Sequence, residues 1–159
     1  MEGFAQAKLT SNKWDGFVSA SYSNFNVQRD GLFKNERYLE NSFGTGEKVS
    51  LSSLSYKGGF TYFLTGRHWF KANAAMIEKP PIVQNIFVNP RENNEIVPEI
   101  QKENISSLDV SYFVRLPSLT GRISAFYTRF QNTTDINFFF VDSGLGSDFV
   151  QEVITGLDR

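Results

Sequence analysis

Residues 104–131 hold two segments in which apolar and polar side chains alternate across a short turn. Leu108, Val110, Tyr112, Val114 and Leu116 occupy every second position of the first segment, and Ile123, Ala125 and Tyr127 continue the pattern after the turn at residues 117–121. A period of two is typical of a β-strand with one apolar and one polar face. The polar face carries the charged residues Asp109, Arg115 and Arg122. We therefore expect a hairpin with one face in water and the other against a second sheet or against lipid.

The same alternation recurs along the chain and predicts further strands at residues 5–10, 14–25, 56–64 and 70–76. A last strand is expected to rise through residues 136–141, turn near residues 142–146 and descend from Phe149. The pattern predicts an all-β, antiparallel up-and-down meander of about seven strands.

The lengths of the predicted connections also alternate. Short turns are expected at residues 11–13, 65–67 and 117–121, long polar segments at roughly residues 28–54 and 78–104, and a medium one near residues 142–148. Short turns on one edge and long loops on the other are typical of outer-membrane barrels, whereas Greek-key sandwiches mix the lengths more. The predicted strands at 14–25 and 105–116 exceed the usual ~5–6 residues and match the ~9–11 that cross a bilayer at a tilt. Both features favour lipid on the apolar face.

Composition narrows the function classes. The 159 residues suffice for one domain, and a net charge of −1 with scattered basic residues predicts no nucleic-acid partner. The absence of cysteine excludes disulfides and thiol chemistry. Sixteen phenylalanines with a mean hydropathy of −0.30 fit strands in which apolar and polar residues interleave. No run of about 18 apolar residues predicts a membrane helix, and residues 1–14 lack the apolar stretch of a secretory signal.

Candidate chemistry is sparse. His68 is the only histidine, so neither a Ser-His-Asp arrangement nor a His-rich metal site is expected, and we interpret it as a strand-end residue. Glu92, Glu95, Glu99 and Glu103 are calcium or acid–base candidates, but a solvated loop face is the favoured interpretation. The sequence therefore predicts no enzyme, no metal and no cofactor.

Three further segments allow two interpretations each. The polar residues Arg91, Asn93 and Asn94 are candidate ligand-contacting residues of the long loop, or are simply hydrated. Residues 138–140, three phenylalanines in succession, form either an aromatic patch near a barrel mouth or a strand covered on both faces. Residues 144–146, Gly-Leu-Gly, lack the third glycine of a dinucleotide-binding fingerprint and predict a turn.

Several motifs, taken in order, resemble the barrel of TonB-dependent receptors. They are the segment 80–94 (PPIVQNIFVNPRENN) followed by Glu103 and Ser111-Tyr112; Lys57-Gly58-Gly59 with Tyr62, the turn at residues 65–68 and Asn73; and residues 127–130 (YTRF). The resemblance covers residues 3–159. Ser111 departs from the pattern, because such barrels often have glycine before the tyrosine.

The resemblance implies a barrel of about 22 strands with an internal plug domain. It also implies import of a scarce nutrient (siderophore, cobalamin, peptide or glycan), energised by an inner-membrane complex through TonB. The sequence shows neither a plug, nor a TonB-contacting segment, nor the aromatic C-terminal residue typical of such barrels. About seven strands are too few to close, since closed bacterial barrels have at least eight. We expect residues 1–159 to be an internal fragment of a receptor barrel in the cell outer membrane, without plug or remaining strands.

Under this hypothesis the two faces of the sheet have different surroundings. The polar residues Asp109, Arg115 and Arg122 are expected to face the lumen beside the plug. The residues expected to face outer-membrane lipid are Val18, Ala20, Tyr22, Leu108, Val110, Tyr112, Val114, Ile123, Ala125 and Tyr127.

Two alternatives remain open at this point. One is a soluble β-sandwich binding module, with carbohydrate as a candidate ligand. The other is a small complete barrel serving as an adhesin or anchor, which the missing signal segment disfavours.

Overall fold

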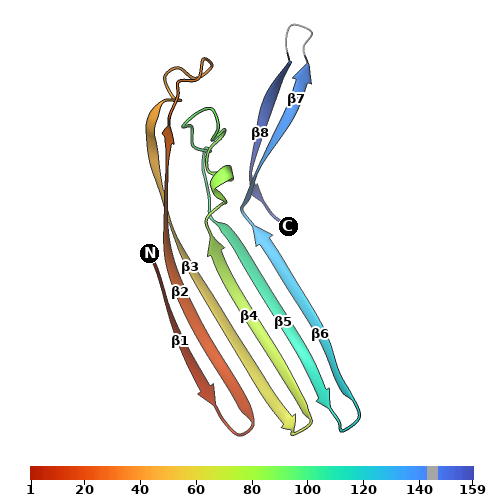
Figure 1. The fold of residues 1–159 in the computed structure, drawn as a ribbon. Helices are drawn as coiled ribbons and strands as arrows, with labels where there is room; N and C mark the ends of the chain where they lie inside the picture. Colours follow the sequence, from red (N-terminus) through yellow and green to blue (C-terminus); the bar gives the residue numbers. More distant parts are fainter. Residues whose placement is uncertain (143–146) are drawn as a thin grey trace. The chain divides into compact units, whose positions relative to one another are not determined.

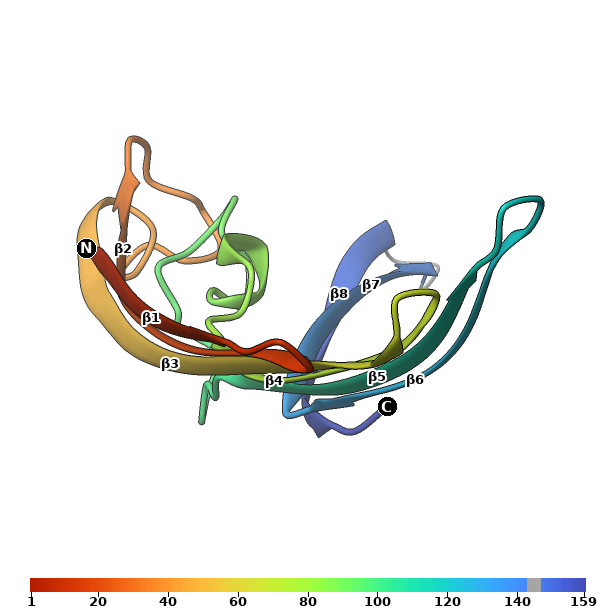
Figure 2. The ribbon, with the colours of Figure 1, turned by 90° about the horizontal axis from the view of Figure 1, so that it is seen from below.

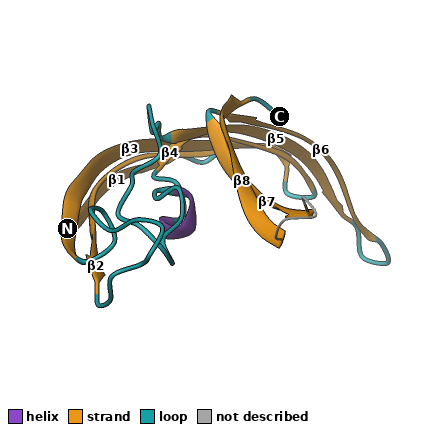
Figure 3. Ribbon diagram, turned by 90° about the horizontal axis from the view of Figure 1, so that it is seen from above, coloured by secondary structure: helices purple, strands orange, loops and turns teal. Residues whose placement is uncertain are grey.

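The computed structural model describes residues 1–142 and 147–159. The strands are β1 (Glu2–Thr10), β2 (Trp14–Gly31), β3 (Gly44–Thr65), β4 (His68–Lys79), β5 (Glu103–Arg115), β6 (Thr120–Gln131), β7 (Thr133–Asp142) and β8 (Ser147–Leu157) (Figure 1). The short 3-10 helix η1 (Val83–Asn85) lies in the connection between β4 and β5 (Figure 3).

The strands form two antiparallel sheets. β1 to β6 pair in chain order in a six-stranded sheet, whose neighbouring ribbons are followed in Figure 2, and β7 pairs with β8 in a second sheet. The predicted all-β meander is confirmed, although the structure has eight strands where about seven were expected. The described strands do not close into a barrel, because β1 and β6 are the outer strands of the larger sheet.

The strands β2 and β3 are longer than the alternation predicted. β2 continues to Gly31 and β3 begins at Gly44, so the expected loop at residues 28–54 is wrong and only residues 32–43 connect the two strands. The apolar residues change parity here: Val18, Ala20 and Tyr22 occupy even positions, whereas Phe25 and Val27 occupy odd positions. Because the apolar positions shift by one residue, the alternation no longer predicts one continuous strand, although the backbone pairing continues.

The chain forms two compact units, and unit 1 comprises residues 1–23, 52–78 and 104–130. Cross-strand contacts identify which side chains share a face in this unit. On one face the Trp14 ring lies 6.0 Å from that of Phe60, and the Phe70 ring lies 5.0 Å from that of Tyr112. We call this side the apolar face; it carries the even positions of β2 to β5 and the odd positions of β6.

The opposite side of unit 1 is the polar face, where the Ser111 and Ser124 hydroxyls lie 2.9 Å apart. Parity places all ten residues expected to meet lipid on the apolar face, and Asp109, Arg115 and Arg122 on the polar face. The structure thus separates the two sets, while what each face contacts stays a prediction.

Unit 2 comprises residues 24–51, 79–103 and 131–159 and contains a small core. Val49, Ile86 and Phe87 are buried, and Phe25, Val27, Leu51, Ile96 and Ile100 pack against them. The predicted long connection after β4 is present over residues 80–102. It is folded, since an antiparallel bridge joins Phe87 to Ile96.

The sheet of β7 and β8 follows a break at Asn132, which has a positive φ of 57°. Its strands confirm the rise expected at residues 136–141 and the descent from Phe149. The predicted turn near residues 142–146, with its Gly-Leu-Gly sequence at 144–146, falls mostly outside the described residues. Phe138, Phe139 and Phe140 are each at least half exposed, so in the described chain this strand is not covered on both faces.

Candidate functional site

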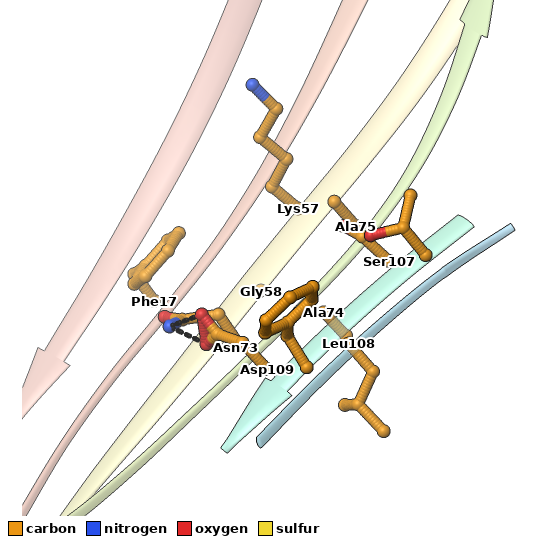
Figure 4. A pocket seen from close by; sticks show the side chains of 11 residues that line it. Phe17, Lys57, Gly58, Asn73, Ala74, Ala75, Ser107, Leu108 and Asp109 are labelled. Atoms are coloured by element: carbon orange, nitrogen blue, oxygen red, sulfur yellow. Dashed lines mark hydrogen bonds between the residues drawn. The ribbon is translucent and has the colours of Figure 1, made fainter. Parts of the chain in front are cut away.

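The polar face of unit 1 has a hollow of about 370 Å³ where β2 to β6 lie side by side (Figure 4). At its centre Asn73 of β4 faces Asp109 of β5, and the Asn73 Nδ2 group donates to both carboxylate oxygens of Asp109, at 2.9 and 2.6 Å. The other lining residues are Phe17, Lys57, Gly58, Ala74, Ala75, Ser107, Leu108, Phe126 and Thr128.

Gly59 makes room for this arrangement. A Cβ atom at Gly59 would lie 2.3 Å from a ring carbon of Phe17 and 2.6 Å from Oδ1 of Asn73. Glycine in a strand interior often marks such a close approach. Figure 4 shows Phe17 next to the Asn73–Asp109 pair, with Lys57 extending away from it. Sequence reasoning missed Phe17 and Asn73 as members of this site, and the glycine pair at 58–59 was the signal for them.

The hollow offers a carboxylate, two hydroxyl groups (Ser107 and Thr128) and the rings of Phe17 and Phe126. This set can accept hydrogen bonds from a bound group and pack against its apolar surface. The lining residues include no nucleophile beside a base, and the groups that they offer are suited to binding.

A stack of four side chains lies on the same face. The rings of Trp69 and Phe113 are 5.2 Å apart and nearly parallel, at 6°. The Arg115 guanidinium lies 5.4 Å from the centre of the Trp69 ring, and the Arg122 guanidinium lies 5.6 Å from that of Phe113. Each guanidinium is therefore held over an aromatic face, an arrangement that the ring's electrostatics favour.

This stack brings together two of the three residues expected to face the lumen. Arg115 and Arg122 flank the Trp69–Phe113 pair, and the Arg122 Nε group donates to the Ser124 hydroxyl at 2.6 Å. Asp109 instead belongs to the hollow with Asn73. Trp69 and Phe113 were missed from the sequence, although two aromatic residues at the polar parity of neighbouring strands were a usable signal.

His68 is the first residue of β4, which confirms its interpretation as a strand-end residue. Its Nδ1 atom lies 2.7 Å from the Tyr112 hydroxyl, and the two rings stack at 6.0 Å. Because this contact joins two neighbouring strands on the apolar face, its evident role is to pair β4 with β5.

The candidate ligand-contacting residues of the loop separate into two kinds. Arg91 is exposed, whereas Asn93 is fully buried and Asn94 is only 8% exposed. The Asn94 Oδ1 atom accepts a hydrogen bond from Arg29, and its backbone N–H donates to the Asn41 carbonyl at 2.7 Å. The two asparagines are thus neither hydrated nor open to a ligand from solvent, and only Arg91 is placed to meet one.

Arg29 ties both connections of unit 2 to β2. Its Nε group donates to the Pro90 carbonyl at 2.7 Å and its Nη1 group to the Ser42 carbonyl at 3.2 Å, besides the bond to Asn94. Gly31 is required at this point, because a Cβ there would lie 1.9 Å from the Ser42 carbonyl oxygen. The connections at 32–43 and 80–102 are therefore fixed by one partly buried guanidinium.

Among residues 1–142 and 147–159, no three acidic or histidine side chains are grouped so as to hold a metal ion. The described chain also contains no helix that is long and apolar enough to cross a membrane. Comparison of the sequence and structure with models of protein families, with curated proteins and with solved structures finds no match.

Proposed function

We propose that this chain forms part of the wall of an outer-membrane transport barrel of the TonB-dependent receptor class. The observation that carries the proposal is a continuous apolar band on the apolar face of unit 1. On β2 the band covers the even positions of residues 14–22 and on β3 those of residues 54–64. These lengths are close to the ~9–11 residues with which a tilted strand crosses a bilayer.

The apolar band lies on the five strands β2 to β6 and ends at neighbouring positions on each of them. The next residues of the same parity are Asn24, Ser52, Glu78, Ser106 and Arg129. A hydrogen bond from the Leu54 backbone N–H to the Glu78 carboxylate, at 3.0 Å, joins two of these strands near the border. A shared polar border across several strands is expected where a wall leaves the hydrocarbon layer.

Aromatic side chains gather at both borders of the band. Near the short turns Tyr62 pairs with Phe70, whose ring lies 5.0 Å from that of Tyr112, and Trp14 begins β2. Tyr22 and Tyr127 lie near the opposite border. Aromatic girdles at both interfaces are a property of membrane barrels.

The side chains of the apolar band are exposed in the described chain. Val18, Leu108 and Ile123 are 66%, 50% and 75% exposed, respectively. A soluble sandwich would bury these side chains against a facing sheet, so their exposure supports lipid as the missing partner. The outer strands β1 and β6 support pairing with further strands, because lipid does not tolerate an open sheet edge.

In this proposal the polar face lines the lumen, beside the plug domain of the intact receptor. The connections at 32–43 and 80–102 lie on the extracellular side and take part in capturing a scarce nutrient, and TonB with its inner-membrane complex supplies energy. The residues described here supply a rigid wall and rigid loops, which is the part of transport that they can perform.

The two tryptophans provide a direct test, because Trp14 lies on the apolar face and Trp69 on the polar face. The variants Trp69→Phe and Trp14→Phe each keep one of them. In vesicles of lipid with brominated acyl chains, we expect strong quenching of Trp14 fluorescence and little quenching of Trp69. Equal quenching, stronger quenching of Trp69, or a chain that stays in solution as a folded monomer would contradict the proposal.

A further inference from the structure

A second hollow of about 600 Å³ opens on the polar face where the first two short turns meet β5. Lys13 and Asn12 come from the turn between β1 and β2, Phe63 and Trp69 from β3 and β4, and Arg115 from the end of β5. It is distinct from the hollow around Asn73 and Asp109, since the two share no lining residue.

Both charged residues that line this hollow are cations. Neither Lys13 nor Arg115 makes an ion pair with a residue that the structure describes, and Asp15, two residues after Lys13, is not among the lining residues. The imbalance extends over unit 1, in which eight lysines and arginines stand against four acidic residues, although the whole chain has a net charge of −1. The hollow therefore carries an excess of positive charge that an anion would balance.

Hydrogen bonds fix the backbone at both cations, and the Arg115 side chain is also held by an aromatic contact. The Phe63 backbone N–H donates to the Lys13 carbonyl at 2.8 Å, and the Arg115 backbone N–H donates to the Arg67 carbonyl at 2.8 Å. The Arg115 guanidinium also lies over the Trp69 ring, which is stacked in turn on Phe113. A binding group that is ordered before its ligand arrives loses little entropy on binding.

We propose that this hollow binds a phosphate-type oxyanion between Lys13 and Arg115. A guanidinium presents a planar fork of N–H groups that matches two oxygens of a phosphate, and an ammonium adds a point charge. The Asn12 side-chain amide is a further donor in the lining. The hollow exceeds the size of inorganic phosphate, and the rings of Phe63 and Trp69 offer an apolar surface, so a phosphate ester fits as well as the free ion. The site stands on the polar face of unit 1 and does not depend on what covers the apolar face.

The test measures inorganic phosphate binding to the full chain by equilibrium dialysis at constant ionic strength, in a medium where circular dichroism shows a folded β protein. Trp69 fluorescence in the Trp14→Phe background gives a second readout from within the hollow. We expect saturable binding that Arg115→Gln and Lys13→Gln each weaken by about tenfold or more, since each removes one charge-assisted contact. Arg115→Lys should weaken binding less than Arg115→Gln, because it keeps the charge and loses the fork.

Lys8→Gln is the matched control, since it removes one cation of unit 1 outside the hollow. Its phosphate affinity should stay within about twofold of the wild type. A phenyl phosphate competitor with higher affinity than phosphate would favour an ester as the occupant, and equal affinity the free ion. Absence of saturable phosphate binding, equal losses in Lys8→Gln and Arg115→Gln, or binding of an oligoglutamate peptide without binding of phosphate would overturn the proposal.

Discussion

At the scale of single residues, the polar face is organised by contacts that cross from strand to strand. Asn73 reaches Asp109, Ser111 reaches Ser124, and Arg115 and Arg122 cover an aromatic pair. Each contact joins neighbouring strands and so fixes their register, because a shift by one residue would move every partner to the other face. The side chains that give this face its character are also those that specify the pairing of β4, β5 and β6.

Gly59 offers a prediction at this scale. Gly59→Ala should lower the free energy of unfolding by about 1–3 kcal/mol, since the new Cβ meets Phe17 and Asn73 at distances that force both to move. Gly3→Ala is the control: it too lies in a strand, and nothing lies within 4 Å of its added Cβ. Urea unfolding in lipid or detergent measures both. If the two variants were equally stable, the close approach of Phe17 and Asn73 would be wrong.

The sequence predicted which face of the sheet each residue would occupy. It did not predict which residues of the same face would be in contact. Alternation placed Asp109, Arg115 and Arg122 on one face, which the structure agrees with. It did not show that Asp109 would bind Asn73, or that the arginines would lie over Trp69 and Phe113. In each case the partner lies on a neighbouring strand, and the alternation does not determine how two strands are aligned.

At the scale of elements, the strands, the short turns and the long connection after β4 followed from the pattern, whereas the connection between β2 and β3 did not. The segment expected to be a loop at 28–54 holds the ends of β2 and β3, where apolar residues occupy the opposite parity and pack with Ile86 and Phe87. A single-period pattern cannot anticipate this, because the change of phase follows from a core formed by residues far along the chain. Asn94, a polar residue in a loop, is buried where it meets the Arg29 guanidinium and the Asn41 carbonyl.

The Arg29 contacts lead to a prediction about these connections. Asn94→Ala removes an acceptor from a partly buried guanidinium, which should cost about 1–3 kcal/mol of local stability. Amide hydrogen exchange in residues 80–102 should become faster, while exchange in β4 and β5 stays slow. Arg91→Ala is the control, since Arg91 is exposed in the same connection. Unchanged protection in Asn94→Ala would show that the hydrogen bond between Asn94 and Arg29 does not hold this connection in place.

At the scale of the whole molecule, the central claim is that the two faces of unit 1 meet different surroundings. On the alternation alone, a test of this claim would compare arginine substitutions at Val110 and at its neighbour Ser111. The structure argues against Ser111 as a control, because it is only 5% exposed and lies 2.9 Å from Ser124. Ala125 and Phe126 of β6 form a better pair, since both are exposed and they lie on the apolar and polar faces, respectively.

The most direct measurement compares Ala125→Arg with Phe126→Arg in the barrel that we propose, as the free energy of unfolding in lipid vesicles. The account predicts a cost of about 2–4 kcal/mol for Ala125→Arg near the bilayer midplane, because the guanidinium meets hydrocarbon. It predicts a much smaller cost for Phe126→Arg, whose side chain meets water. Equal costs, or a larger cost for Phe126→Arg, would contradict the assignment of lipid to the apolar face.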